Sequence, residues 1–142
     1  MTPEFSEDMV LLELNARWNC QLPFGWIPMC DTAVDKETVD IYDSEYFHHF
    51  DEEVKQCLRD TFNASTLYEI EEGGTVRLLK LEECVFGYRS LEYMYTDLSF
   101  SFLLYFSHEE SVTVGGEKLR NEIHRIGPEH FMHFWPPASW NP

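Results

Sequence analysis

The chain has 142 residues, of which 44% are hydrophobic and 15% aromatic, and its formal net charge is −16. This length fits one domain over residues 1–142 with a core large enough to fold without a disulfide or a metal. The negative charge disfavours binding to nucleic acid or to anionic membranes, and no two of the ten Lys and Arg residues are adjacent.

The cysteines and the N-terminus bear on the compartment. The start Met1-Thr2-Pro3-Glu4 has neither a basic residue nor a long apolar run, so we expect no signal peptide. An even number of cysteines leaves a disulfide-bonded secreted protein open as an alternative. They are far apart and form no Cys-x-x-Cys motif, which favours free thiols in a reducing cytoplasm (Cys20, Cys30, Cys57 and Cys84).

The first half of the chain predicts two helices. Residues Phe5 to Asn19 fit an amphipathic helix with Ser6 as its N-cap. Gln21 to Asp43 contains prolines and a glycine, which predict a loop with short strands around Gly25–Met29 and Val39–Tyr42. Ser44 to Asn63 predicts a second helix, because apolar residues recur there at steps of three and four.

The second half predicts strands and a closing helix. Glu72-Gly73-Gly74 is typical of a hairpin turn, and Gly115-Gly116 ends the last strand. A short helix follows, with Leu119, Ile123 and Ile126 on one side. The expected strands are Thr66–Glu71, Val76–Leu81, Cys84–Tyr88, Leu91–Tyr95, Leu98–Ser107 and Ser111–Val114, and the expected helix is Glu117–Arg125.

This order of elements predicts an α+β fold. We expect an antiparallel sheet of five to six strands with the helices on one face. The tail from Gly127 to Pro142 is rich in proline and aromatic residues. We expect it to pack on the sheet, and a partner contact or a homo-oligomer contact is the alternative.

Catalytic signatures are missing from the sequence. It has no Gly-x-Ser-x-Gly motif and no phosphate-binding glycine loop, so we expect no cofactor and no enzymatic activity. A metal site would need three or four ligands that converge. The candidate ligands are His108, His130 and His133, but their spacing does not establish a site.

Charge is concentrated in one region. Between Asp31 and Glu53 there are nine acidic residues and one base, Lys36, with tyrosines and phenylalanines among them. Such a segment is either a solvated surface or a docking face for a basic protein, in which charges steer and aromatic residues anchor. The residues that we predict to bind a partner are Asp31, Asp35, Glu37, Asp40, Tyr42, Asp43 and Glu45.

The segment Tyr105-Phe106-Ser107-His108-Glu109-Glu110-Ser111-Val112-Thr113-Val114-Gly115-Gly116, with the short helix after it, resembles the C-terminal part of small acidic immunity proteins of bacterial toxin systems. In those proteins a strand ends in a similar turn, and a short strand and a closing helix follow. The resemblance covers twenty to thirty residues. It implies an α+β domain that binds and neutralises a co-encoded toxin.

The sequence therefore predicts a cytoplasmic immunity-type protein. Its partner would be a basic toxin domain such as a nuclease, whose active site it covers. Two alternatives stay open at this stage. One is a small enzyme that uses histidines and carboxylates, with or without a metal, and the other is an interaction module of a larger assembly.

Overall fold

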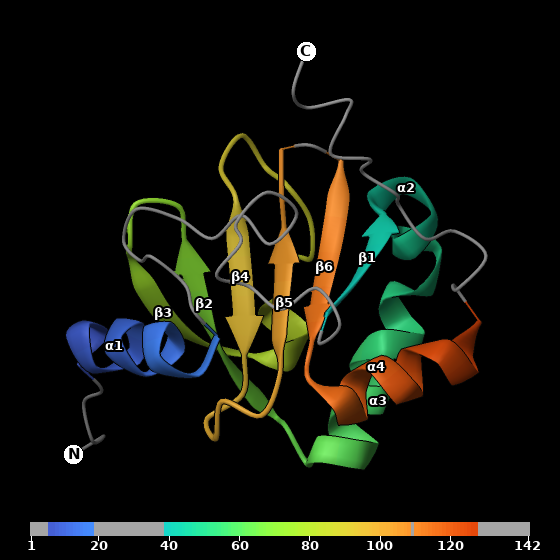
Figure 1. Ribbon diagram of the computed structural model, residues 1–142, viewed down its shortest axis with the longest axis horizontal. Helices are drawn as coiled ribbons and strands as arrows, with labels where there is room; N and C mark the ends of the chain where they lie inside the picture. The colour runs from blue at the N-terminus through green and yellow to red at the C-terminus, as the bar shows by residue number, and fades with distance from the viewer. Residues whose placement is uncertain (1–5, 19–38, 109, 128–142) are drawn as a thin grey trace.

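A computed structural model describes residues 6–18, 39–108 and 110–127. Six strands form one sheet in the order β1-β6-β5-β4-β2-β3, and every neighbouring pair is antiparallel. The predicted α+β class and the predicted antiparallel sheet are confirmed (Figure 1). Within these residues, no helix is long and apolar enough to cross a membrane.

The described residues form helices α1, α2, α3 and α4, six strands and two 3-10 turns. The N-terminal elements are α1 (Glu7–Trp18), β1 (Val39–Asp43), α2 (Ser44–Phe47), η2 (His48–Phe50) and α3 (Asp51–Phe62). The central elements are β2 (Thr66–Glu71), β3 (Val76–Lys80), η3 (Leu81–Glu83) and β4 (Tyr93–Thr96). The last three are β5 (Leu103–Phe106), β6 (Ser111–Gly115) and α4 (Glu117–Ile126).

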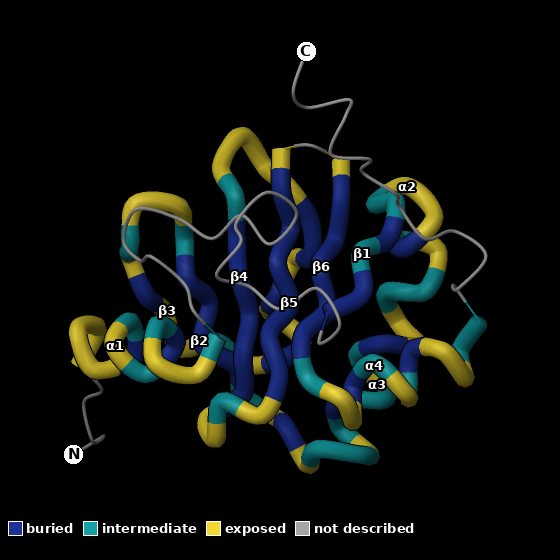
Figure 2. The backbone as a smooth tube through the Cα atoms, in the orientation of Figure 1, coloured by how far each residue is buried: buried dark blue, intermediate teal, exposed yellow. Residues whose placement is uncertain are grey.

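Helices cover both faces of the sheet, which corrects the expectation that all of them lie on one face. α1 packs on one face through Val10 and Leu14, and α3 and α4 pack on the other (Figure 1). Adjacent residues of β5 pack on opposite faces of the sheet. Leu103 lies in the core beneath α1, and Leu104 lies in the core beneath α3 and α4. Figure 2 shows that the middle strands are buried along their length.

The predicted first helix is confirmed, and its local signals explain its position. The backbone N–H of Met9 donates to the Ser6 hydroxyl at 3.3 Å, as the predicted N-cap requires. At the other end the Trp18 ring lies against β6. A Cβ added to Gly115 would come within 2.7 Å of that ring, so any other residue at this position would force the ring to shift.

The predicted second helix is broken into α2, η2 and α3. Asp43 is the N-cap of α2, and its carboxylate accepts the backbone N–H of Glu45 at 3.0 Å. α3 is capped at its C-terminus by Asn63, which adopts the left-handed conformation with φ of 52°. Phe47, Val54 and Leu58 are buried against the sheet, as the periodicity predicts.

Two of the predicted strands differ from the structure by more than two residues at an end. Leu98–Ser107 is a strand only over β5, because Asp97 folds the preceding residues into a turn. Its carboxylate accepts the backbone N–H of Ser101 at 2.7 Å. Cys84–Tyr88 forms no strand. Side chains hold its backbone instead, since Lys55 donates to the Cys84 carbonyl at 2.7 Å and Tyr95 donates to the Val85 carbonyl at 3.1 Å.

Candidate partner-binding surface

Only part of the predicted partner-binding set lies in the described structure. Asp31, Asp35 and Glu37 fall outside the described residues, as do the proposed strand Gly25–Met29, Cys20, Cys30 and the aromatic tail. Asp40, Tyr42, Asp43 and Glu45 are described, and they divide into two groups. The first two are buried, and the last two lie at the junction of β1 with α2.

Asp40 and Tyr42 face the core beneath α4 and not the surface, which corrects their assignment to the docking face. The Asp40 carboxylate lies 2.8 Å from Nε2 of His124 and 3.3 Å from Nε of Arg120. The Tyr42 ring is fully buried, and its hydroxyl donates to Asp40 at 3.4 Å. These contacts attach β1 to α4, so the two residues stabilise the fold.

The exposed carboxylates continue beyond β1 into the helices. Residues 43–53 contain no Lys or Arg, and we call this stretch the acidic segment; its carboxylates belong to Asp43, Glu45, Asp51, Glu52 and Glu53. Three of the five, Glu45, Glu52 and Glu53, are exposed. Their positions in the first turns of α2 and α3 also suit the positive end of a helix dipole.

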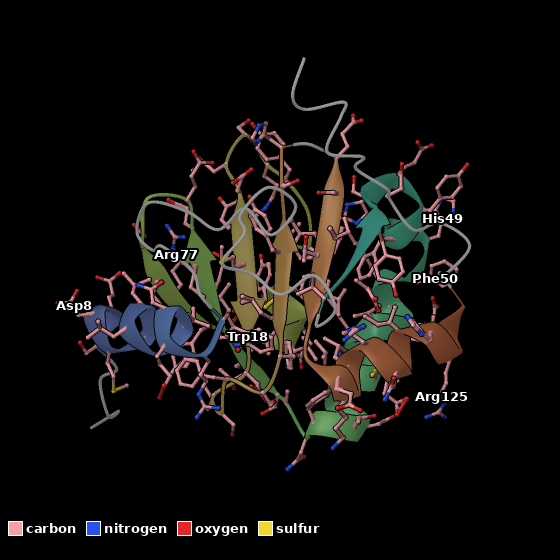
Figure 3. All side chains as sticks on the ribbon, in the orientation of Figure 1. Asp8, Trp18, His49, Phe50, Arg77 and Arg125 are labelled. Atoms are coloured by element: carbon pink, nitrogen blue, oxygen red, sulfur yellow. The ribbon has the colours of Figure 1, made fainter. Side chains whose placement is uncertain are left out.

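Aromatic rings accompany these charges. Tyr46 is 42% exposed, and its ring meets that of His49 edge to face, with the centroids 6.1 Å apart. Figure 3 shows His49 and Phe50 at the bend between α2 and α3. An amphipathic tyrosine among carboxylates is a residue type that anchors protein interfaces.

His48 is turned inward at the same bend. Its Nδ1 lies 3.1 Å from the Asp51 carboxylate, and its ring stacks on that of Phe106. The hydrogen bond that the His48 ring donates to the Asp51 carboxylate raises the pKa of His48 above its ordinary value, while partial burial acts in the opposite direction. Because Asp51 is engaged by His48, the charge that the acidic segment presents outward comes mainly from the three exposed glutamates.

Most arginines of the described chain are bound to carboxylates of the chain itself. Arg89 lies 3.2 Å from Glu69, and Arg77 lies 2.9 Å from Glu71. Further ion pairs join Arg17 to Glu13, Arg120 to Asp40 and Arg125 to Glu122. Positive charge is therefore neutralised locally, and the excess of carboxylates remains on the surface.

Glu69 is the centre of a buried polar network that sequence reasoning missed. Its side chain is 5% exposed, yet its carboxylate accepts the Tyr95 hydroxyl at 2.6 Å and binds Arg77 and Arg89. The Arg89 guanidinium also lies 4.1 Å above the Tyr93 ring centroid. A glutamate in the middle of an apolar strand was the available signal. The network supports the loop between η3 and β4.

The described residues do not assemble the predicted metal ligands. His108 pairs through Nδ1 with Glu92, a carboxylate that also accepts the Tyr105 hydroxyl at 2.6 Å. His130 and His133 lie outside the described residues. Within the described part of the chain, no three His, Cys, Asp or Glu side chains are grouped so as to hold a metal ion.

The two described thiols lack the environment of a nucleophile. Burial raises the pKa of Cys84 to about 12, and burial also raises the pKa of Cys57. Both cysteines are free thiols. A thiol with a raised pKa is protonated at neutral pH, and these two side chains therefore serve packing.

Comparison with known proteins adds no assignment. No family model, no curated protein and no solved structure matches this chain.

Proposed function

We propose that this protein binds a cationic partner protein through its acidic segment, in the manner of an immunity protein that covers the active site of a basic toxin domain. The observation that carries the proposal is the charge distribution. Exposed carboxylates occupy α2 and the start of α3 in a stretch without Lys or Arg, while five of the described arginines are bound elsewhere in the chain. A surface of one sign accelerates encounter with a surface of the other.

The mechanism is stoichiometric occlusion. A nuclease binds phosphates with cationic side chains, and the carboxylates of the acidic segment can form ion pairs with the same side chains. Tyr46 then contributes apolar contact area once the charges have brought the two surfaces together. Inhibition of this kind needs no catalytic group on the inhibitor.

The test uses two triple variants with the same change in charge. The first is Glu45→Lys with Glu52→Lys and Glu53→Lys, in the acidic segment. The matched control is Asp8→Lys with Glu82→Lys and Glu117→Lys, which are exposed acids elsewhere. Asp8 and Glu117 occupy first turns of α1 and α4, so the control also reproduces the loss of favourable helix-dipole contacts.

The binding partner to assay is the product of the gene adjacent to the one that encodes this chain. We expect the first triple variant to weaken the complex by about tenfold or more at physiological salt, and to lose protection against the partner's toxicity. The control should bind as the unmodified protein does. Equal losses in the two variants would show that only overall charge matters, and unchanged binding in both would reject the docking surface.

A further inference from the structure

The sheet has two edge strands, β1 and β3, which differ in whether side chains bond to their outward backbone groups. Figure 1 shows them at opposite ends of the sheet. An edge strand presents backbone N–H and C=O groups that another chain can pair with, so natural proteins commonly block such edges. In an antiparallel ladder, residues whose backbone groups bond to the neighbouring strand alternate with residues whose N–H and C=O point outward.

β3 is blocked by carboxylates. Glu71 N–H donates to the Thr75 carbonyl, and Leu81 N–H donates to the Ser65 carbonyl. These two bonds fix which residues of β3 bond to β2 and which have their backbone groups pointing outward. Its outward residues are therefore Val76, Leu78 and Lys80. The Val76 N–H donates to Glu7 of α1 at 2.8 Å, and the Lys80 N–H donates to Glu83 at 2.9 Å. Two of the three outward donors of β3 are thus already bonded.

β1 shows no such block at its centre. The bond from Ser44 N–H to the Glu110 carbonyl continues the pairing of Asp43 with Ser111. Asp40 and Tyr42 therefore bond to β6, and Ile41 turns both its N–H and its C=O away from the sheet. In the described part of the chain, no side chain bonds to the Ile41 amide, and Ile41 is only partly buried.

Charge decides what kind of strand can add there. β1 leads directly into the acidic segment, with Asp43 at its end and Glu45 two residues later. A second copy of this chain would bring the same carboxylates and another net charge of −16 to the edge. That repulsion disfavours self-pairing, whereas a strand that carries Lys or Arg would be attracted.

We propose that the β1 edge is the docking strand for a cationic, extended segment of the partner protein, which adds to the sheet beside Ile41 by main-chain hydrogen bonds. This inference rests on the proposed function and gives it a geometry. The backbone of Ile41 supplies the register and part of the affinity, and the acidic segment supplies the attraction.

The protein variants remove one outward donor at a time. Ile41→Pro deletes the outward N–H of β1 without removing a bond to β6, and proline is tolerated at such edge positions. Leu78→Pro makes the same change on the outward side of β3 and is the matched control. Ile41→Ala retains the N–H and shows what the side chain alone contributes. Circular dichroism and urea unfolding establish that each variant is folded.

The probe is a synthetic octapeptide of alternating Lys and Val, and its N-methylated twin has the same charge but cannot pair with a strand edge. We expect the first peptide to slow hydrogen exchange of the Ile41 amide at least tenfold, and the twin to leave it unchanged. Ile41→Pro should weaken binding of the first peptide at least tenfold, whereas Leu78→Pro and Ile41→Ala should not. The N-methylated twin keeps the test decisive even if Ile41→Pro fails to fold.

The outcomes separate this inference from the proposed function. Equal binding of both peptides, or no slowing of Ile41 exchange at saturating peptide, overturns strand addition while charge-driven docking stands. Slowed exchange that survives Glu45→Lys with Glu52→Lys and Glu53→Lys would overturn the role of the acidic segment. A dimer of the free protein that Ile41→Pro dissociates would show that a second copy occupies the edge, and would overturn the cationic partner.

Discussion

A buried carboxylate is costly unless its oxygens are bonded, and Glu69 meets this condition through side chains of neighbouring strands and a loop. Tyr95, which faces it from β4, is fully buried. Burial and the Glu69 hydrogen bond raise the pKa of the Tyr95 hydroxyl above its ordinary value, so this group remains a donor throughout the neutral range. The pair links β2 to β4 beneath the η3–β4 loop.

Replacing Tyr95 by Phe tests whether this pair stabilises the fold. The change removes the 2.6 Å bond to Glu69 and the bond to the Val85 carbonyl, and leaves a buried carboxylate with fewer donors. We expect the free energy of unfolding to fall by about 1.5–3 kcal/mol, measured by urea denaturation at neutral pH. Tyr88→Phe, at an exposed tyrosine of the same loop, should change it by less than about 0.5 kcal/mol. Equally small effects of the two changes would show that the hydroxyl bonds of Tyr95 do not stabilise the fold.

At the residue scale the sequence shows which side chains are acidic or aromatic, but it does not show which of them become buried. In the sequence Asp40 is one of several acids in an acidic run. It is buried because β1 pairs with β6 and because its carboxylate contacts side chains of α4. Its partner His124 is 84 residues away in the chain. Tyr42 is buried for the same reason. Long-range contacts of this kind leave no local pattern, so the docking face could be predicted as a region but not residue by residue.

At the scale of elements, the two carboxylates on β3 provide a test of edge protection. We expect Glu7→Ala with Glu83→Ala to expose the Val76 and Lys80 donors and to lower the free energy of unfolding by about 1–3 kcal/mol in total. The variant should also associate at high protein concentration, as sedimentation velocity would show.

The control for this prediction is Asp8→Ala with Glu82→Ala. These exposed acids are the sequence neighbours of Glu7 and Glu83, and their removal changes the net charge by the same amount as the first double variant does. The control should stay monodisperse wherever the unmodified protein does. Association of both variants to the same extent would mean that lost repulsion, and not an opened strand edge, drives it.

The elements that the sequence predicts well are those with local signals. α1 has its cap and its apolar stripe, and the β2–β3 hairpin has its double glycine and its alternation. The errors occur where side chains from other elements determine the backbone. Phe86 enters the core from a loop that reads as a strand, and the loop is held there by Lys55 and Tyr95. Apolar content alone does not distinguish such a loop from a strand.

At the scale of the molecule, covering both faces of the sheet explains the apolar run Phe102 to Phe106. A strand with one solvated face alternates between apolar and polar residues, whereas a strand buried on both faces is apolar throughout. All residues of β5 are buried, as are those of β6. The run therefore contained the information that helices lie on both faces, and the expectation of one covered face overlooked it.

The net charge of the whole chain predicts opposite responses of folding and binding to salt. At −16, self-repulsion destabilises the compact state, and added salt screens it by shortening the Debye length from about 30 Å at 0.01 M to about 3 Å at 1 M. Raising sodium chloride over this range should therefore increase the free energy of unfolding by on the order of 1 kcal/mol, measured with urea because it is uncharged. Affinity for the cationic partner should fall over the same range. Glu45→Gln with Glu52→Gln and Glu53→Gln should reduce both responses, because it removes charge from the acidic segment. Stability that falls with salt would mean that the internal arginine pairs outweigh the repulsion between carboxylates.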